Sequence, residues 1–597
     1  MNILGFNCYG HDSAASLVDD GGIAFAVEEE RLNRKKHNGD FPVQSIRACL
    51  ASRNLQISDL DHVGFSWKPW ISYPRIPQYF FRFIKHVPAI LRESRSWTQE
   101  EGLGMLNQWQ KMHDLPNLFR REFGSGYRAK FHFLEHHFCH AASAFYCSPF
   151  EDSAILTVDG GGEWTTTQLS AGRGLQIKRL SGVSIPHSLG AFYQAIACYL
   201  GFQIISGPGK MMGLSAYGDQ NHSTYDQMRK LIRFTSDGGF RLDLSYFDYT
   251  HTRKRGVSLK FERVFGAPPK VLNVPGKSPV VQWEDRHLHV AAAAQRIVED
   301  AFLHMARWLH TKTQSRNLCV AGGVGLNSVA NGRLIGETPF KEIFIQPAAA
   351  DSGTSLGAAL WIKHAILKKP RRAPLADAFL GPGYTDAECE NALQKSGLSY
   401  KKSPDYTRIA ARLLNENKIL GWFQGRMEFG PRALGNRSIL ANPCHPDMKD
   451  ILNSRVKFRE GFRPFAPIVL EEACGEYFDQ SYPNPYMLLV YQVRPEKRRL
   501  IPSVTHVDGT GRIQSVNHRE NPQMWELLNA FKEVSGVPIL INTSFNIKGE
   551  PIVTTPEHAV DSFERADMDY LVLGPYVAAK SALSLEHAFK HSSAVAA

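Results

Sequence analysis

The chain has 597 residues, of which 43% are hydrophobic and 21% are charged. This composition is ordinary for a globular protein, and the length exceeds what one hydrophobic core usually organises, so two or more domains are expected. The formal net charge of +11 favours anionic partners such as phosphates and nucleotides. The basic residues are dispersed without a long Lys/Arg block, so no nucleic-acid-binding surface is evident.

The cysteines and the N-terminal residues indicate the compartment. The nine cysteines form no CxxC pair and have no zinc-type spacing, and the opening "MNILGFNCYG" lacks the basic and apolar segments of a signal peptide. No window approaches the length and hydrophobicity of a transmembrane helix. We therefore expect a reduced, soluble protein of the cytoplasm.

A unit of strand, polar or Gly-rich loop, strand, tight turn and strand occurs twice in the first third of the chain. The expected strands lie at 2–8, 15–18 and 23–27 in the first copy and at 153–158, 165–170 and 175–180 in the second. Both copies have the turn residues of β-hairpins. A later strand near 317 runs through paired glycines into a helix start. The pattern predicts a duplicated α/β domain with a cleft between its lobes.

The loops that follow these strands are suited to phosphate. Glycine lets backbone N–H groups approach phosphate oxygens, and acidic side chains at strand ends can hold a bridging metal ion. Any one Gly-rich loop is more often a simple turn, but three of them in one architecture favour nucleotide binding. The residues expected to contact the nucleotide are Asp159, Gly160, Gly322, Gly323, Asn327 and Asp351.

Four histidines gather in "HFLEHHFCHAASAF", residues 132–145. If a helix covers 136–146, His136 and His140 share one face, the spacing that two imidazoles need to bind one metal ion, and His137 points about 100° away. An isolated HxxxH is more often an ordinary polar helix start, but Asp159 and Asp351 are at hand in loops. Two histidines and two aspartates suit a metal such as Fe, Mn or Zn.

The chain resembles one known family over essentially its whole length. The motifs that carry the resemblance are, in order, "GHDSAA", "EEERLNRKKH", "EHHFCHAASAF", "TVDGGGEWTTT", "GKMMGLSAYG", "AGGVGLNSVAN", "QPAAADSGTSLGAAL", "WFQGRMEFGPRALGNRSIL", "LNSRVKFREGFRPFAP", "HVDGTGRIQSV" and "INTSFNIKGEPIV". Together they look like the carbamoyltransferases, a family that includes nodulation-factor, cephalosporin and aminoglycoside (tobramycin-type) O-carbamoyltransferases.

The resemblance implies an α/β protein of two domains. Residues 1–367 would form a duplicated actin-like ATPase (ASKHA) domain, related to enzymes of tRNA threonylcarbamoylation, that holds nucleotide, metal and acceptor. Residues 378–597 would form an α+β, YrdC-like domain that makes carbamoyl-adenylate. The basic, Pro-containing segment 368–377 is expected to be the linker.

The implied activity is ATP-dependent O-carbamoyl transfer in two stages. Carbamoyl phosphate and ATP give carbamoyl-AMP, and the carbamoyl group then passes to a hydroxyl of a small natural product or sugar. The implied cofactors are ATP with Mg²⁺ and a divalent metal, for which the resemblance favours iron over manganese or zinc. No nucleic acid or membrane partner is expected, and a homodimer is an option that the sequence leaves open.

His11 is the best candidate for the general base. It lies in a loop at a strand end, and an imidazole is near neutral at physiological pH, so it can accept the proton of the acceptor hydroxyl. By resemblance it matches the catalytic histidine of the family, and Lys36 is assigned to the same mouth. Lys210 is expected to approach a phosphate. Many relatives have Glu where this chain has Pro208, so a role carried by that Glu is in doubt.

The C-terminal motifs supply cations for phosphate. Arg binds phosphate through two parallel hydrogen bonds, and Lys adds a point charge. By resemblance, the residues that bind carbamoyl phosphate are Arg432, Lys457, Arg463, Arg512, Asn542 and Ser544. Asn546 is expected to line the same pocket. Arg437, Arg455 and Arg459 are interpreted as ordinary surface or salt-bridge residues.

Acceptor choice and the rival functions stay open. Residues 66–130 and 219–285 read as insertions, where acceptor specificity would lie, although residues 76–94 are better interpreted as amphipathic helices packed on the core with Tyr and Phe inside. A tRNA-modifying enzyme of the threonylcarbamoylation type is the alternative function. A regulatory protein with an inactive nucleotide site ranks below it.

Overall fold

The computed structural model describes residues 1–88, 105–124, 126–252, 256–272 and 280–590. The chain forms two compact units. The first unit comprises Met1–Glu29 and His37–Leu375, and the second unit comprises Glu30–Lys36 and Ala376–Ala597. The division after Leu375 falls inside the segment expected to be a linker. No pattern in the sequence indicated that Glu30–Lys36 groups with the C-terminal residues.

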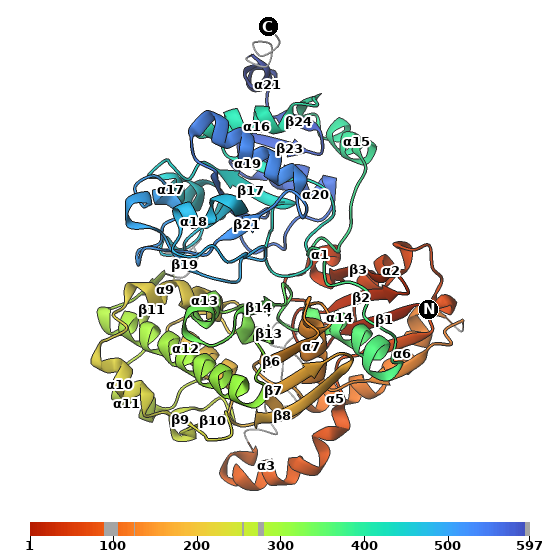
Figure 1. The fold of residues 1–597 in the computed structure, drawn as a ribbon, viewed down its shortest axis with the longest axis vertical. Helices are drawn as coiled ribbons and strands as arrows, with labels where there is room; N and C mark the ends of the chain where they lie inside the picture. The colour runs from red at the N-terminus through yellow and green to blue at the C-terminus, as the bar shows by residue number, and fades with distance from the viewer. Residues whose placement is uncertain (89–104, 125, 253–255, 273–279, 591–597) are drawn as a thin grey trace. The chain divides into compact units, whose positions relative to one another are not determined.

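The first unit contains two five-stranded sheets of the same topology (Figure 1). In spatial order, the first sheet contains β3 (Gly22–Glu28), β2 (Ala14–Asp19), β1 (Ile3–Asn7), β4 (His62–Phe65) and β5 (Lys130–Phe133). The second sheet contains β8 (Gln176–Ser184), β7 (Thr165–Arg173), β6 (Asp152–Val158), β13 (Asn317–Ala321) and β14 (Glu342–Ile345). In each sheet the first three strands pair antiparallel and the last two join in parallel. The duplicated, actin-like organisation is confirmed.

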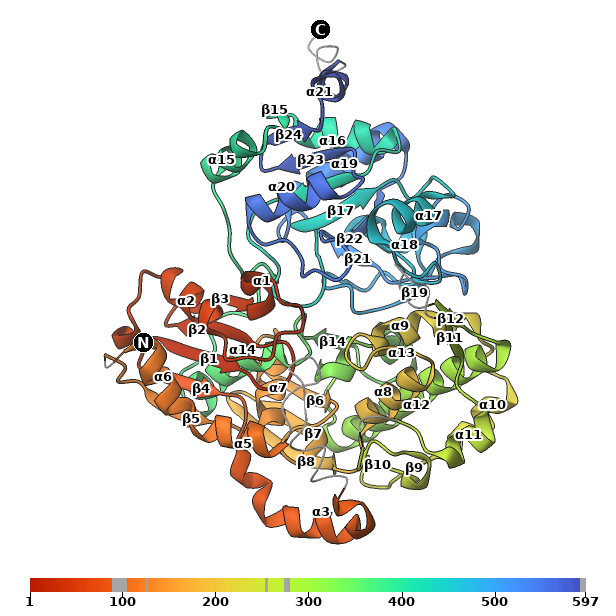
Figure 2. The ribbon, with the colours of Figure 1, turned by 180° about the vertical axis from the view of Figure 1, so that it is seen from behind.

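Two helices lie between these sheets, and predicted metal ligands lie on them or directly before them. They are α7 (His136–Phe145), which packs on β6 and β13, and α14 (Ser352–Leu360), which packs on β1 and β2 and on α7 (Figures 1 and 2). A Cβ on Gly357 would lie 1.9 Å from the carbonyl oxygen of Cys139, so only glycine permits this helix contact. The central strand β1 is buried at all five positions, as expected for a strand covered on both faces.

The remaining elements of the first unit surround this core. The helices are α2 (Val43–Ala51), α3 (Ile76–Arg82), α5 (Met105–His113), α6 (Leu115–Phe123), α8 (Leu189–Tyr199), α9 (Gly207–Leu214), α10 (Ser223–Arg229), α11 (Leu259–Phe265), α12 (Asp285–Thr313) and α13 (Ser328–Glu337). The short strands are β9 (Ile232–Phe234), β10 (Phe240–Leu242), β11 (Lys270–Leu272) and β12 (Val280–Gln282).

Helix α3 confirms a helix within the predicted helical region 76–94, but the expectation that the aromatic side chains lie inside is wrong for Phe81. Phe81 is 80% exposed, and the neighbouring Ile84 is 63% exposed. Residues 89–94 of that prediction lie outside the described residues.

The second unit is an α+β layer structure. Its eight-stranded mixed sheet contains β15 (Ser399–Lys402), β24 (Tyr576–Ala579), β23 (Tyr570–Leu573), β16 (Leu420–Phe423), β17 (Arg437–Ala441), β22 (Ile539–Ser544), β18 (Ala466–Leu470) and β21 (Gln514–Val516). A separate ribbon pairs β19 (Tyr491–Gln492) with β20 (Thr510–Gly511). The helices are α15 (Asp386–Ser396), α16 (Tyr406–Asn415), α17 (Met448–Leu452), α18 (Cys474–Tyr477), α19 (Pro522–Ser535), α20 (Pro556–Arg565) and α21 (Ala582–Phe589). The α+β class expected for this part is confirmed.

The N-terminal segment Glu30–Lys36 is bonded into this second unit. It includes most of α1 (Glu29–Asn33). Arg31, which is 4% exposed, donates to the carbonyl of Gly430 at 2.9 Å. Arg34 donates to the carbonyls of Pro551 and Ile552 at 2.8 and 2.6 Å. Buried guanidinium–carbonyl bonds of this kind make the segment an integral part of the unit.

Two further observations concern the cysteines and membrane-spanning helices. All nine cysteines are free. Across the part of the chain that the structure describes, no helix is both long and apolar enough to span a bilayer.

Candidate metal centre and anion-binding site

Four predicted metal ligands converge in the first unit. His136 and His140 lie one turn apart on α7, Asp159 follows β6, and Asp351 precedes α14. The Nε2 atoms of the two histidines are 3.1 Å apart, and each lies within 3.7 Å of an oxygen of Asp159 and of Asp351. The four donor atoms all fall within 4.8 Å of one another. This set of two imidazoles and two carboxylates fits a divalent metal ion.

The surrounding groups hold these donors in place. His136 Nδ1 lies 3.3 Å from the carbonyl oxygen of Ser66, which leaves Nε2 facing the carboxylates. The backbone N–H of Gly323 donates to Asp159 at 3.0 Å. Burial lowers the pKa of His136, but the carboxylates of Asp159 and Asp351 raise it well above its usual value. A cation would relieve this crowding of charged groups.

His137 does not join the set, as predicted from helical geometry. It lies on the same turn of α7 as His136 and is 1% exposed. Its Nδ1 bonds the hydroxyl of Thr157 at 2.8 Å instead. Burial lowers its pKa well below the usual range, so it is a neutral core residue.

The predicted nucleotide-binding residues include glycines near Asp159 and the helix-capping residue Asn327. The glycines beside Asp159 are Gly160, Gly322 and Gly323. Gly322 has φ +89°, and a Cβ at this position would come 2.3 Å from the carbonyl oxygen of Val158. The side chain of Asn327 is already engaged, because it caps α13 through the N–H of Ala330 and exchanges two hydrogen bonds with Gln295.

Lys210 lies on α9, the helix that contains the unusual Pro208. Pro208 is in the first turn of this helix, where the missing N–H has no intrahelical acceptor to lose. The substitution is therefore compatible with the helix. The expected approach of Lys210 to a phosphate stays a prediction.

His11 is part of a chain of three polar side chains. Its Nδ1 lies 3.0 Å from one oxygen of Asp12, and the other oxygen of Asp12 lies 2.9 Å from Nδ1 of His37. The His11 side chain is 43% exposed. A Cβ on the preceding Gly10 would be 3.2 Å from Asp351, so the loop adjoins the metal ligands. Asp12 thereby keeps the proton of neutral His11 on Nδ1 and leaves Nε2 as the basic nitrogen.

The charge state of His11 depends on the same carboxylates. Burial lowers its pKa, but Asp351, Asp12 and Asp159 raise it, with a net result of about 10. A cation bound by Asp159 and Asp351 would cancel much of this attraction and return the imidazole towards its ordinary pKa. The two parts of the first unit's site are therefore electrostatically linked.

Lys36 does not belong to the unit that contains His11. It lies in the segment Glu30–Lys36 of the second unit, where its charge lowers the pKa of Lys457. The next residue, His37, belongs to the first unit and bonds Asp12, the partner of His11, at 2.9 Å. The predicted role of Lys36 beside His11 stays a prediction.

Those cations form one group, here called the cation cluster, made of Arg432, Lys457, Arg459, Arg463 and Arg512. Burial and the neighbouring cations lower the pKa of Lys457 and Arg512 well below their usual values and that of Arg432 to about 10. In the part of the chain that can be placed, the only carboxylate in ion-pair contact with the cluster is Glu460, 3.8 Å from Arg463.

Two members of the cluster have unsatisfied donors. The buried Nε atoms of Arg432 and Arg512 make no hydrogen bond to any described residue. A buried guanidinium without an acceptor is costly, and phosphate oxygens are the ligands that guanidinium groups bind best. The geometry is that of an anion-binding site.

Lys457 organises the motif "NTSFN" around the cluster. Its Nζ donates to Ser544 and Asn546 through both backbone and side-chain oxygens, at 2.6 to 3.3 Å. Asn542 donates to the carbonyl of Ala433 and to Gln514, and its buried Oδ1 has no partner among the described residues.

The interpretation as surface or salt-bridge residues is correct for Arg455 but wrong for Arg437 and Arg459. Arg455 is an exposed ion-pair partner of Asp567 at 2.6 Å. Arg437 is fully buried, but it lies over Phe423 and donates to backbone carbonyls, so its role is structural. Arg459 is a member of the cation cluster and stacks on Phe465 at 4.2 Å. The local sequence around Arg459 carried no signal that separated it from Arg455.

Sequence reasoning also missed Glu428. One oxygen of this buried side chain accepts the backbone N–H groups of Leu434, Asn436 and Arg437 at 2.7 to 3.1 Å. It closes the loop that contains Arg432. The only signal was an acidic residue inside a Gly-rich, basic motif.

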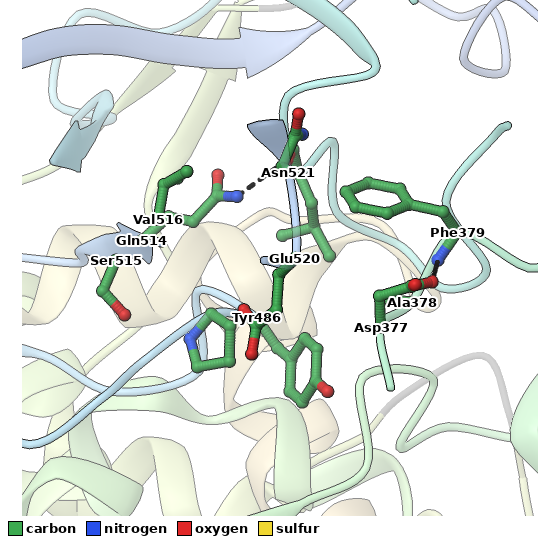
Figure 3. A pocket seen from close by; sticks show the side chains of 11 residues that line it. Asp377, Ala378, Phe379, Tyr486, Gln514, Ser515, Val516, Glu520 and Asn521 are labelled. Carbon is green, nitrogen blue, oxygen red and sulfur yellow. Dashed lines mark hydrogen bonds between the residues drawn. The ribbon is translucent and has the colours of Figure 1, made fainter. Parts of the chain in front are cut away.

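A hollow in the second unit is too small for a substrate, and Figure 3 shows the side chains that line it. Phe379 and Tyr486 lie at its wall with the carboxylates of Asp377 and Glu520. Gln514, which also lines it, accepts from Asn542. Its volume is about 20 Å³, the space of roughly one water molecule.

The family follows from comparison with known proteins. A model described as the carbamoyltransferase N-terminus matches residues 2–360, and one described as the carbamoyltransferase C-terminus matches residues 411–580. The chain belongs to the carbamoyltransferase family. This carbamoyltransferase is therefore a transferase enzyme.

Its relatives include proteins named for nodulation. Nodulation protein NolNO of Sinorhizobium fredii is 37% identical, over 97% of this chain and 80% of that protein. An uncharacterized Synechocystis protein is 40% identical over 97% of both chains. Among solved structures, HypF of T. kodakarensis is similar over 62% of this carbamoyltransferase and 47% of its own chain, with 13% identity and a TM-score of 0.31, which is too low to define a fold.

Proposed function

We propose that the enzyme catalyses ATP-dependent O-carbamoyl transfer from carbamoyl phosphate, through carbamoyl-AMP, to a hydroxyl of a small molecule. The observation that carries this proposal is the cation cluster, five buried or half-buried cations with two unsatisfied guanidinium donors. A cluster of this charge is suited to a compound or a reaction step that brings several phosphate oxygens together.

The first stage takes place in the second unit. Carbamoyl phosphate and water give carbamate and phosphate, and an oxygen of carbamate attacks the α-phosphorus of ATP, so that pyrophosphate leaves and carbamoyl-AMP forms. Arg432, Lys457, Arg463 and Arg512 bind the phosphate oxygens, with Asn542 and Ser544 beside them. Lys36 adds positive charge to this site. The cations stabilise the charge that develops on the leaving pyrophosphate.

The second stage belongs to the first unit. The acceptor hydroxyl attacks the carbamoyl carbon, Nε2 of His11 takes its proton, and AMP leaves with the electrons of the broken bond. Asp12 holds His11 in the tautomer that this role needs. His136, His140, Asp159 and Asp351 would hold a divalent ion, which would supply positive charge for nucleotide phosphates. Resemblance favours iron, with manganese and zinc as alternatives, and Mg²⁺ accompanies ATP.

The acceptor is proposed to be a sugar or another hydroxylated natural product. This acceptor class is what the motif resemblance implies, and one relative, nodulation protein U of Sinorhizobium fredii, is 29% identical over 90% of this chain and 92% of that protein. The two family models match residues 2–360 and 411–580, which favours this reading over a tRNA-modifying enzyme.

Pyrophosphate release tests the proposal. Release from ATP should require carbamoyl phosphate, should be lost in Arg512→Ala, and should survive in His11→Ala, whose defect lies in the later transfer. Release that does not depend on carbamoyl phosphate, or that is lost equally in His11→Ala, would refute this division of labour. Retention of the protein on RNA at low salt, weakening as salt rises, would support the tRNA alternative.

A further inference from the structure

One aromatic residue stands between two members of the cation cluster. Phe458 follows Lys457 and precedes Arg459 in the sequence. Lys457 is buried and Arg459 is half-buried, whereas Phe458 is 52% exposed. Its ring makes no aromatic or cation–π contact with the described residues, because Arg459 stacks on Phe465 instead. A large apolar side chain is thus presented at a highly charged site.

The backbone at Phe458 is unusual for such a residue. It has φ +45° and ψ +49°, the left-handed conformation, immediately after the helical turn Asn453–Lys457. Glycine or asparagine adopts this conformation at helix ends far more readily than a bulky residue does. Strained residues of this kind persist where the surroundings require them, and they cluster at binding sites.

The left-handed residue has a consequence for the cations. If the helix continued, Lys457 and Arg459 would point about 200° apart, on opposite sides. The reversal at Phe458 lets both cations reach the same cluster. Any residue could supply that reversal, and glycine would do so without strain, so the turn alone does not account for a phenyl ring.

We propose that the ring of Phe458 is the platform on which the adenine of ATP stacks while its phosphates lie in the cation cluster. The inference rests on the proposed function, since it takes ATP as the anion-bearing substrate of the second unit. An exposed π-face one residue from two phosphate-binding cations matches a ligand that joins an aromatic base to phosphates. Carbamoyl phosphate has no aromatic base, so the ring of Phe458 contributes to the binding of ATP and not to that of carbamoyl phosphate.

The test compares Phe458→Gly, Phe458→Leu and Phe458→Trp in carbamoyl-phosphate-dependent ATP–pyrophosphate exchange by the full chain. Loss of base stacking should raise KM for ATP roughly 5- to 100-fold in the Gly and Leu variants. KM for carbamoyl phosphate should stay within about twofold of wild type. Phe458→Trp should keep the ATP affinity, because the indole ring also stacks on a base. Thermal stability of Phe458→Gly should not fall, because glycine relieves the left-handed strain.

The outcomes distinguish the inference from the function beneath it. If exchange is normal and KM for ATP is unchanged in both Phe458→Gly and Phe458→Leu, the platform is refuted and the proposed activation step stands. If both substrates weaken together, or if Phe458→Trp is as impaired as Phe458→Leu, the ring acts by shaping the backbone and the inference is wrong. If wild type shows no exchange that depends on carbamoyl phosphate, the activation step and the platform both fail.

Discussion

Replacing Arg512 by methionine should stabilise the second unit and abolish its response to phosphate. Arg512 has a buried, unpartnered Nε, and the cations Arg432, Arg459 and Arg463 lower its pKa well below the usual range. Burial, the largest cause of that pKa shift, acts in the same direction. Folding therefore confines a charged group that neither water nor a protein acceptor satisfies.

The magnitude follows from these contacts. An unsatisfied buried donor costs about 1–3 kcal/mol, and replacing buried charges by apolar side chains of similar size often stabilises a protein by about 1–4 kcal/mol. We expect Arg512→Met to gain about 1–3 kcal/mol, which for a unit of this size raises Tm by roughly 2–12 °C. In wild type, phosphate at a hundred times its Kd should add about 2.7 kcal/mol by mass action.

The assay is calorimetric unfolding of the full chain at neutral pH with and without inorganic phosphate. The transition of the second unit is the one that phosphate shifts in wild type. Arg455→Met is the matched control, since Arg455 forms an exposed ion pair with Asp567 and should change stability by less than about 1 kcal/mol while the phosphate response remains. The reasoning is refuted if Arg512→Met is less stable than wild type without phosphate, or if phosphate still stabilises it fully.

Four further predictions follow from single residues. Glu428→Ala should cost at least about 3 kcal/mol, measured by chemical unfolding, because three backbone donors lose a charged acceptor; a cost below about 1 kcal/mol would contradict this. His140→Ala should lower metal content, measured by elemental analysis, whereas His137→Gln should not, and equal loss in both would count against the assigned ligands. Asp12→Asn should reduce acceptor carbamoylation about 10²- to 10⁴-fold with pyrophosphate release intact, and loss of both would rule out a positioning role. Burial holds the pKa of Lys457 well below its unfolded value of about 10.4, so between the folded and unfolded pKa values the unfolded chain binds more protons than the folded chain. The free energy of unfolding should therefore rise with pH in that range. Lys457→Met should flatten this rise, and an unchanged slope would disprove the prediction.

The duplicated core could be predicted from local sequence because each copy specifies its own hairpins. Strand, turn and strand patterns are local, and the loops between them end at the same edge of each sheet. His136 and His140 were recognisable for the same reason, since a spacing of four residues on a helix fixes which side chains face together. Asp159 and Asp351 could be joined to them only as a hypothesis, because 192 positions separate the two and the packing of α7 on α14 brings their loops together.

Other assignments failed where the same residue type occurs in several environments. Arg455 and Arg459 look alike in the sequence, yet one is an exposed ion-pair partner and the other belongs to the cation cluster. Asn327 follows a Gly-rich loop, and its predicted contact with nucleotide stays a prediction, while its amide caps a helix and bonds Gln295. Burial and hydrogen-bond partners, which depend on distant segments, decide between such roles.

By itself, the sequence determined the family, the repeated strand order of the first unit and the spacing of its histidine pair, because these depend on residues close together in the chain. Only the tertiary structure decided that Glu30–Lys36 belongs with the C-terminal residues and that Lys36 joins the cations around Lys457. The hydrogen bonds of Arg31 and Arg34 to distant carbonyls hold this segment in the second unit. Contacts over roughly 400 to 500 residues have no local signature, so no pattern within the segment could reveal them.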